Sequence, residues 1–299
     1  MIVVRRLVIN ADDLGLTVGV NDGIFDAHDH GILTSASLFA GAPATFDAIR
    51  RARSRPSLGV GVHLALVDGT PTLPPGRVPT LVEDDGRFRR SWKPFIVACL
   101  RGKVSLAEVE LELTAQIERL RSAGVTLTHL DAHKHVHAYP PVFDIVARLA
   151  GRFGIPVVRV PYEQWTRIDG DAYSRGTMRV QALLNAAMRP WARRDYRTAA
   201  SHDLRTPHFV GRIHTGILTA DALAGLVRTL PPGVTELMVH PGYADDELER
   251  TGTRLLQSRQ HELGLLCSLE ARALLVGERV ELLRHDLTHV MKRSFRHVS

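Results

Sequence analysis

Short runs of apolar and β-branched residues alternate along the chain with longer segments of helical periodicity, and this alternation limits the fold more than any other feature. The predicted strands are residues 7–9, 36–40, 58–64, 127–130, 157–160, 209–213 and 236–239. The predicted helices are residues 19–30, 45–53, 106–123, 141–153, 220–229 and 253–275. Alternating strands and helices are typical of βαβ units and a parallel sheet. About seven parallel strands with intervening helices predict an α/β fold, an irregular (β/α) barrel.

The chain of 299 residues contains no internal repeat and no long linker rich in Gly, Ser or Pro, so we predict one domain over residues 1–299. Two insertions interrupt the alternation. Residues 70–93 are rich in Pro, Gly and charge, which predicts a long loop of the kind that is often functional in compact domains. Residues 163–212 carry nine Arg, no Lys and five acidic residues. We predict that this second insertion covers the mouth of the barrel or contacts another subunit.

The second insertion also contains a predicted helix with one apolar face. The residues of that face are Val180, Leu183, Leu184, Ala187, Met188 and Trp191. Because arginines flank the face, one hypothesis is that residues 177–197 rest on an anionic membrane surface as a peripheral contact. A homodimer contact and a solvated basic helix are the alternatives.

Composition excludes several classes of protein. No apolar run reaches the roughly 18–20 residues of a membrane span, which excludes a transmembrane topology. Cys99 and Cys267 lie far apart and support neither a disulfide framework nor a cysteine-based zinc site. Residues 1–10 lack the apolar region and cleavage site of a secretory signal. Because of the two isolated cysteines and the lack of a signal, we expect a cytoplasmic protein. The net charge of +6 is too small to indicate nucleic-acid binding.

Acidic and histidine side chains follow the predicted strands. Two adjacent carboxylates, Asp12 and Asp13, come directly after the first strand, where barrel enzymes build their sites. A helix N-cap before residues 19–30 is the alternative interpretation of these two acids. His63 ends the third predicted strand, where it belongs to the same site or is a hydrogen-bonded core residue.

A histidine-rich segment, HLDAHKHVH at residues 129–137, follows the fourth predicted strand. Its alternate positions hold four histidines and Asp131, which project to one face for as long as the strand continues. Neutral imidazole and carboxylate groups bind divalent cations, and a second carboxylate can fix the tautomer of a ligand ring. The segment therefore predicts a metal site. A polar loop that binds nothing is the alternative.

Two further strand ends complete the set. Arg159 lies in the fifth predicted strand and supplies a cation that can orient a carboxylate, and His240 follows the last one before a sharp turn. Together the strand ends hold the side chains of a metal-dependent hydrolase. The sequence lacks the motifs of P-loop phosphoryl transfer, serine hydrolases, HExxH metalloproteases and dinucleotide-binding folds.

Four motifs in this order resemble the YdjC-like carbohydrate deacetylases, a family that includes chitooligosaccharide deacetylases and members associated with hopanoid biosynthesis. They are NADD-x-G at residues 10–15, G-x-H-L at 61–64, HLDAHKHVH at 129–137 and ELMVHPGY at 236–243. The resemblance covers nearly the whole chain, and segments 33–38, 80–88 and 212–219 are similar to the hopanoid-associated branch. Leu14 stands where Phe is frequent, and Lys134 lies inside the histidine run.

The resemblance implies a distorted (β/α) barrel that removes an N-acetyl group from an amino sugar with the help of one divalent metal ion. The residues that it implies as metal ligands are Asp13, His63 and His133. It further implies Asp12 as the general base and His240 as the general acid. Arg159 and Asp131 then orient Asp12 and a ligand imidazole respectively.

The metal and the reaction class stay open at this point. Two histidines and one carboxylate suit zinc by ligand type, whereas the resemblance implies Mg²⁺ in some members. A metal phosphoesterase or amidohydrolase with two metal ions is one alternative, and two ions about 3.5–4 Å apart would favour it. A non-catalytic protein that binds carbohydrate or lipid is the other. The expected partner is a small amino sugar, free or linked to a lipid.

Overall fold

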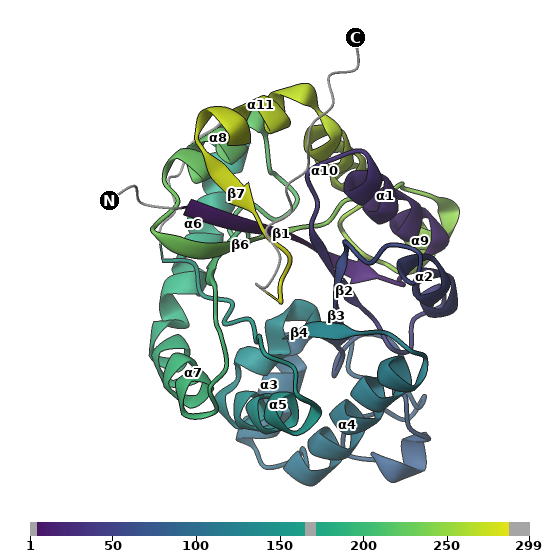
Figure 1. Ribbon diagram of the computed structural model, residues 1–299. Coiled ribbons are helices and arrows are strands. Elements are labelled where there is room, and N and C mark those ends of the chain that lie inside the picture. Colours follow the sequence, from purple (N-terminus) through teal and green to yellow (C-terminus); the bar gives the residue numbers. More distant parts are fainter. Residues whose placement is uncertain (1–4, 165–171, 287–299) are drawn as a thin grey trace.

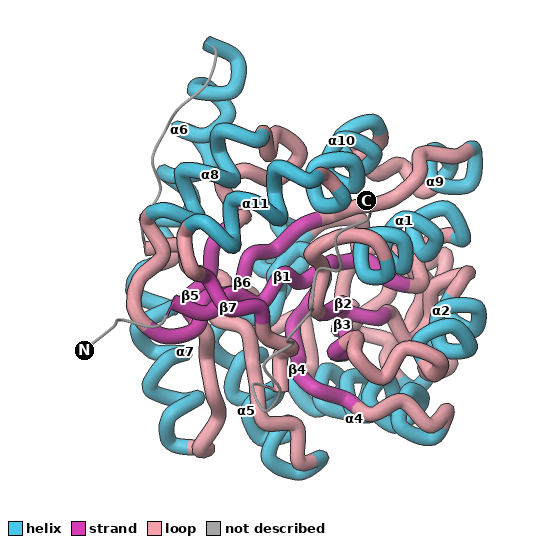
Figure 2. The backbone as a smooth tube through the Cα atoms, turned by 45° about the horizontal axis from the view of Figure 1, so that its top comes forward, coloured by secondary structure: helices cyan, strands magenta, loops and turns pink. Residues whose placement is uncertain are grey.

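The computed structural model describes residues 5–164 and 172–286, and all seven strands in this part of the chain belong to one parallel sheet. The strands are β1 (Arg5–Leu14), β2 (Ser35–Leu38), β3 (Gly59–Leu64), β4 (Leu127–Ala132), β5 (His208–Val210), β6 (Gly233–Val239) and β7 (Val280–Leu282). Their order is β4-β3-β2-β1-β6-β5, and β7 pairs with β1. Helices surround the strands in Figures 1 and 2. The predicted α/β barrel is confirmed.

The barrel is irregular between its two edge strands, β4 and β5. The predicted strand 157–160 is not a continuous strand, and only isolated parallel bridges join this segment to its neighbours. Val158 bridges to Leu130 of β4, and Val157 bridges to Arg205, shortly before β5. Pro156 and Pro161 flank the segment, and proline cannot donate a hydrogen bond to a ladder. The segment therefore spans the gap without forming a full ladder.

The helices follow the predicted pattern with some corrections. They are α1 (Val18–Asp29), α2 (Thr45–Ala52), α3 (Trp92–Leu100), α4 (Leu106–Ser122), α5 (Pro140–Phe153), α6 (Ala172–Ala187), α7 (Arg189–Ser201), α8 (Ala220–Arg228), α9 (Asp246–Arg250), α10 (Gln257–Cys267) and α11 (Leu269–Gly277). The prediction of one helix over 253–275 is wrong. Ser268 has an extended backbone there and accepts a hydrogen bond from the backbone N–H of Ala271, so it ends α10 and caps α11.

Helix α4 shows how the sequence anchors the first insertion. Ser105 accepts a hydrogen bond from the backbone N–H of Glu108, as the capping pattern predicts. Glu112 is buried, and its carboxylate accepts hydrogen bonds from the backbone N–H groups of Thr72 and Leu73, at 2.7 and 3.0 Å. The predicted loop 70–93 is therefore attached to α4 through backbone contacts, and it contains the 3-10 helix η1 (Pro75–Arg77).

The second insertion forms two helices, so the single apolar face predicted for residues 180–191 is wrong. Met188 separates α6 from α7. Pro190 lies in the first turn of α7, the part of a helix in which proline is tolerated. Val180 and Leu183 of α6 are 60% and 73% exposed. Trp191 of α7 instead contacts Tyr139, with ring centroids 5.6 Å apart. Residues 165–171 of this insertion lie outside the described part of the chain.

The C-terminal part of the described chain crosses the amino ends of several strands. β7 pairs with residues Arg5–Leu7 of β1, and the backbone N–H of Leu283 donates to the carbonyl of Leu7. The backbone N–H of His285 then donates to Ser35 Oγ, at the start of β2. This segment was not predicted as a strand because it is only three residues long. It forms the floor of the barrel, opposite the carboxyl ends of the strands.

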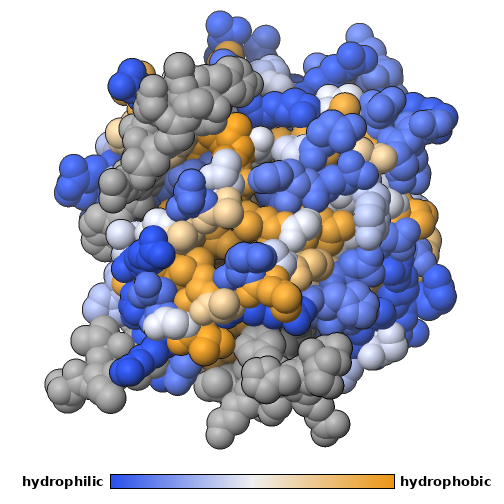
Figure 3. Space-filling view, turned by 90° about the horizontal axis from the view of Figure 1, so that it is seen from above, coloured by the Kyte–Doolittle hydropathy of each residue, from blue (hydrophilic) through white to orange (hydrophobic). Residues whose placement is uncertain are grey.

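Seen from above, apolar side chains gather in the middle of the face and polar side chains surround them (Figure 3). On α11, Leu269 and Val276 are largely exposed. Within residues 5–164 and 172–286, no helix is both long and apolar enough to cross a membrane.

A buried acid on α7 makes the stability of the fold depend on pH. Among the described residues, neither carboxylate oxygen of Asp195 has a hydrogen-bond partner, and burial raises the pKa of Asp195 to about 8. The unfolded chain releases this proton near pH 4, whereas the folded protein keeps it until about pH 8. The folded state therefore binds more protons between these values, and the free energy of unfolding falls as the pH rises through this window.

Asp195→Asn removes this titration. We expect the free energy of unfolding of the variant, relative to the unsubstituted protein, to rise between pH 5 and pH 8 by more than about 1.4 kcal/mol, the value of one pKa unit. Denaturant unfolding of both proteins at the two pH values measures the difference. An equal difference at both pH values would show that Asp195 does not titrate in this way.

Candidate metal centre

The site lies at the carboxyl ends of β1, β3 and β4, and a bulge in β1 builds its acidic part. Asp12 and Asp13 are neighbours, so a regular strand would direct them to opposite faces. The register of β1 against β2 shifts between Ala11 and Leu14, and Asp13 has a left-handed backbone with φ of 70°. A β-bulge re-aims side chains in this way. Both carboxylates are consequently buried in the same site.

The three side chains implied as metal ligands come together. His63 Nε2 lies 3.5 Å from Asp13 Oδ1, and His133 Nδ1 lies 3.4 Å from the same oxygen. One ligand atom from each residue lies within 4.8 Å of the other two. Residues that are 50 and 70 positions apart in the sequence thus point at one small volume.

Other residues hold the outer polar atoms of Asp13 and His63, which leaves the atoms that face each other available. His63 Nδ1 lies 2.7 Å from Asp131 Oδ1, so the ring can present the lone pair of Nε2 toward Asp13. Arg259 Nη2 donates to Asp13 Oδ2 at 2.5 Å, which leaves Oδ1 for a cation. A carboxylate oxygen and two imidazole nitrogens, with Asp13 and His63 fixed from behind, fit a divalent metal ion.

The charge of the buried groups also fits a divalent ion. Asp12, Asp131 and Glu236 contact Arg159, and Asp13 contacts Arg259. When the carboxylates are ionised, these four acids and two guanidinium groups sum to two negative charges. Buried charge without compensation is costly. A cation of charge +2 would therefore neutralise this set of residues.

Arg159 holds Asp12 in place with two parallel hydrogen bonds. Nη1 donates to Asp12 Oδ2 at 2.8 Å and Nη2 donates to Asp12 Oδ1 at 2.7 Å. Burial acts to raise the pKa of Asp12, but the charge and hydrogen bonds of Arg159 outweigh it and hold that pKa well below its usual value. Asp12 is therefore an oriented carboxylate. The role of Arg159 in the reaction, as the residue that orients Asp12, stays a prediction.

His240 and His133 differ in their electrostatic surroundings. Burial lowers the pKa of His240 to about 4, although Asp12 and Asp13 oppose the shift. Burial also acts to lower the pKa of His133, but hydrogen bonds to Asp13 and Asp68 outweigh it and raise that pKa to about 9. The His240 ring is thus neutral at pH 7, whereas a cation that binds at His133 must displace a proton.

The other histidines of segment 129–137 do not join Asp13. β4 ends at Ala132, and the chain turns into the 3-10 helix η2 (His133–Ala138), with left-handed backbones at Lys134 and His135. The alternation of side chains therefore stops, and His137 Nε2 bonds to the carbonyl of Arg159 instead. Lys134 Nζ donates to Asp68 Oδ2 at 2.6 Å.

Several residues of the site were not predicted. Arg259 and Glu262 both come from α10, and Glu262 accepts a hydrogen bond from the backbone N–H of His240 at 2.6 Å. Burial raises the pKa of Glu262 to about 7. Arg259 and Glu262 are three residues apart, so both charged side chains lie on one face of a predicted helix. This spacing was the one sign in the sequence that they could belong to the site. Ser37, which donates to Asp131 Oδ2 at 2.6 Å, gave no signal in the sequence.

A second group of candidate ligand atoms shares His63 with the first. It consists of Asp12, His63 and Asp131. The guanidinium group of Arg159 contacts both acids of this group, within 2.8 Å. A positive side chain therefore already serves these two carboxylates, and the arrangement favours one metal ion at Asp13 over the two-ion alternative.

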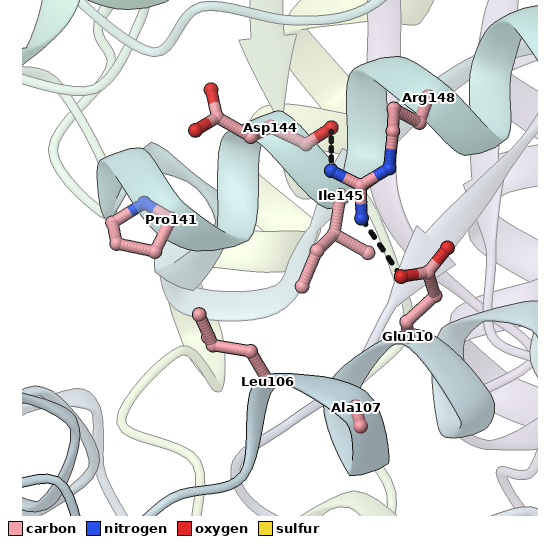
Figure 4. A pocket seen from close by; sticks show the side chains of 7 residues that line it. All are labelled: Leu106, Ala107, Glu110, Pro141, Asp144, Ile145 and Arg148. Carbon is pink, nitrogen blue, oxygen red and sulfur yellow. Dashed lines mark hydrogen bonds and ion pairs between the residues drawn. The ribbon is translucent and has the colours of Figure 1, made fainter.

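A cavity of about 330 Å³ between α4 and α5 lies apart from this site. Figure 4 shows its lining, in which Arg148 lies between Asp144 and Glu110. Arg148 Nη2 donates to Glu110 Oε2 at 2.7 Å, and Arg194 Nη2 donates to Asp144 Oδ2 at 2.6 Å, so the charges of this cavity are paired. None of its lining residues belongs to the Asp and His cluster.

Comparisons with known proteins give matches over most of the chain. A family model described as "YdjC-like protein" matches residues 6–276. A carbohydrate deacetylase of Geobacillus stearothermophilus is 36% identical over 268 residues, which cover 88% of this chain and 89% of that protein. One from Brevibacillus brevis is 33% identical over 278 residues, covering 93% and 97%. A crystal structure described as a putative cellobiose-phosphate cleavage protein of Enterococcus faecalis has a TM-score of 0.76 at 25% identity, covering 95% of this chain and 98% of that one.

The fold and the site together define a parallel (β/α)-barrel protein with a buried aspartate and histidine cluster at the carboxyl ends of its strands. The family model matches about nine-tenths of the sequence, and this match is more specific than the fold alone. The chain belongs to the YdjC-like family.

Asp131→Asn tests whether the contact behind His63 prepares the metal centre. The substitution removes the carboxylate that faces His63 Nδ1, so we expect the Kd of Zn²⁺ or Mg²⁺ to rise by about 10- to 100-fold, as is typical for residues behind metal ligands. Isothermal titration calorimetry measures it. Glu110→Gln, which changes an exposed carboxylate paired with Arg148, serves as the control. A folded Asp131→Asn variant with an unchanged Kd would contradict this role.

Proposed function

We propose that this protein is a metal-dependent hydrolase that removes the N-acetyl group of an N-acetylated amino sugar and releases acetate. The observation that carries the proposal is the convergence of Asp13, His63 and His133 beside Asp12 and His240. The relatives named carbohydrate deacetylase support the reaction class. The sugar is an oligosaccharide or a glycolipid, such as an N-acetylglucosaminyl hopanoid.

Asp13, His63 and His133 are the residues that would hold the single divalent cation. Two imidazole nitrogens and one carboxylate suit Zn²⁺ by ligand type, and Mg²⁺ is the alternative that the family resemblance implies. When bound, such a cation polarises the acetamide carbonyl and lowers the pKa of a water molecule. Arg259 and Asp131 hold the ligand side chains from behind.

Asp12 and His240 move the protons in this proposal. Asp12 takes a proton from the attacking water, and the water oxygen bonds to the acetamide carbon. The bond between that carbon and the sugar nitrogen then breaks, and His240 delivers a proton to the departing amine. Because the pKa of His240 is about 4, its ring is neutral before the reaction. The proton that it delivers is therefore one that it gains during the reaction, from the water by way of Asp12.

The exposed face of α6 supports a finer proposal about the substrate. Val180 and Leu183 of α6 are exposed, and so is Arg179 next to Val180. Exposed apolar side chains beside an arginine suit contact with an anionic lipid surface. This face would bring the barrel to a lipid-linked sugar as a peripheral contact from the cytoplasm, where the free thiols of Cys99 and Cys267 are expected. A homodimer through the same face is the alternative.

Removing the cation tests the metal dependence. We expect chelation followed by dialysis to abolish acetate release, and re-addition of Zn²⁺ or Mg²⁺ to restore it. Acetate release is measured on short N-acetylglucosamine oligomers and on an N-acetylglucosaminyl lipid in anionic and in neutral vesicles. Full turnover after chelation would refute metal dependence.

Equal turnover in both kinds of vesicle would refute the membrane contact, and a concentration-dependent dimer in solution would assign the α6 face to a second copy.

Substitution of the two proton-transfer residues tests their roles. Asp12→Asn and His240→Ala are each expected to lower kcat by about 10²- to 10⁴-fold, the usual contribution of general acid–base catalysis. Circular dichroism and the Kd of the divalent cation check that fold and metal site persist, because neither residue is a proposed ligand. If both variants kept full deacetylase turnover, these role assignments would be wrong.

A further inference from the structure

The floor of the barrel carries a histidine that the proposed reaction does not use. His285 follows β7 and is fully buried. Its backbone N–H donates to Ser35 Oγ at 3.0 Å, and Arg284 beside it donates to the carbonyl of Pro56 at 2.5 Å. The segment after β7 therefore holds this imidazole inside the barrel.

The His285 ring is packed on another imidazole. It stacks on His129 of β4, with ring centroids 3.9 Å apart and an angle of 27° between the planes. The His129 ring in turn lies against the backbone of Gly61, where an added Cβ would approach His129 Nε2 to 2.4 Å. The two rings thus fill the interior between β3 and β4 so closely that only glycine fits at position 61.

The polar neighbour of His285 is Glu236. His285 Nε2 lies 3.4 Å from Glu236 Oε1, and among the described residues neither ring nitrogen of His285 has a well-formed hydrogen bond to another group. Glu236 Oε1 also accepts hydrogen bonds from Arg159, from Nε at 2.8 Å and from Nη2 at 2.5 Å. All three side chains are at most 1% exposed.

Arg159 connects this pair to the proposed reaction. Its guanidinium group is planar and rigid, so the direction of its bonds to Glu236 also sets the direction of its two bonds to Asp12. If the Glu236 side chain changed to another rotamer, the guanidinium group of Arg159 would turn with it, and its paired contact with Asp12 would break. Whatever holds Glu236 in place therefore also orients Asp12.

We propose that His285 is a positioning residue, which holds Glu236 against Arg159 from the floor of the barrel and thereby orients Asp12. The inference rests on the proposed function for the role of Asp12. Removing the imidazole leaves a space beside Glu236 and His129 and takes away the polar group that faces Glu236 Oε1. Among the described residues, the proposed metal ligands Asp13 and His133 do not contact His285, and His63 is connected to it indirectly, through Asp131 and Arg159.

His285→Ala tests the proposal through a separation of kinetic constants. We expect kcat to fall about 10-fold or more, as is common when a supporting residue behind a site is lost. KM stays within about twofold, and the Kd of Zn²⁺ rises less than the 10- to 100-fold expected for Asp131→Asn, because Asp131 itself is retained. His28→Ala is the matched control, because His28 is equally buried but bonds to Leu33 and Ser57, away from the site. We expect this control to lose thermal stability and to keep kcat.

Two conservative variants separate a polar role from simple packing. His285→Gln keeps an N–H donor that can reach Glu236, whereas His285→Phe keeps the ring and loses the donor. We expect Gln to recover more of kcat than Phe does. Recovery by Phe alone would overturn the polar role, and a folded His285→Ala protein with unchanged kcat would overturn the proposal altogether.

A readout that does not depend on activity keeps this inference apart from the proposed function. The Nε–H group of Arg159 is buried and bonded to Glu236, so its NMR signal should exchange slowly with solvent in the unsubstituted protein. We expect at least tenfold faster exchange in His285→Ala and no change in His28→Ala. If the unsubstituted protein released no acetate from any sugar, the proposed function would fail, while unchanged exchange in His285→Ala would separately refute the positioning role.

Discussion

Arg159 is buried in the middle of the barrel, and three carboxylates contact its guanidinium group: Asp12, Asp131 and Glu236. An isolated charge in such a place would be very costly, and the removal of one partner of a buried pair typically costs about 3–5 kcal/mol. The three acids come from β1, β4 and β6. Arg159 itself lies in the segment that spans the gap between β4 and β5. The arginine therefore joins the irregular part of the barrel to its regular strands.

The same cluster determines how the site is prepared. Asp131 shares its oxygens between Arg159 and His63, so one carboxylate both balances the arginine and directs a ligand imidazole toward Asp13. Each acid that Arg159 binds is thereby fixed in orientation before any ligand arrives. Preorganised polar groups of this kind lose little free energy to reorganisation when charge develops in a reaction.

The fold was largely predictable because its signals are local. Apolar runs, helical periodicity and capping residues such as Ser105 depend on neighbours within a few positions. Two of the failures have local causes. Two prolines interrupt the segment at 157–160, and Ser268 divides the helix predicted over 253–275. β7 was missed because three residues carry too little periodicity to be recognised.

The sequence by itself determined which kinds of side chain end the strands, and hence the acids and histidines that the site contains, because strand ends and alternation follow from local rules. Only the tertiary structure decided which of them meet. The bulge at Asp13 turns two neighbouring carboxylates into one site, and the turn at Lys134 leaves His133 as the histidine of its segment that faces Asp13. Arg259 and His285 reach the barrel interior from more than 240 residues beyond β1, through packing that no local pattern encodes.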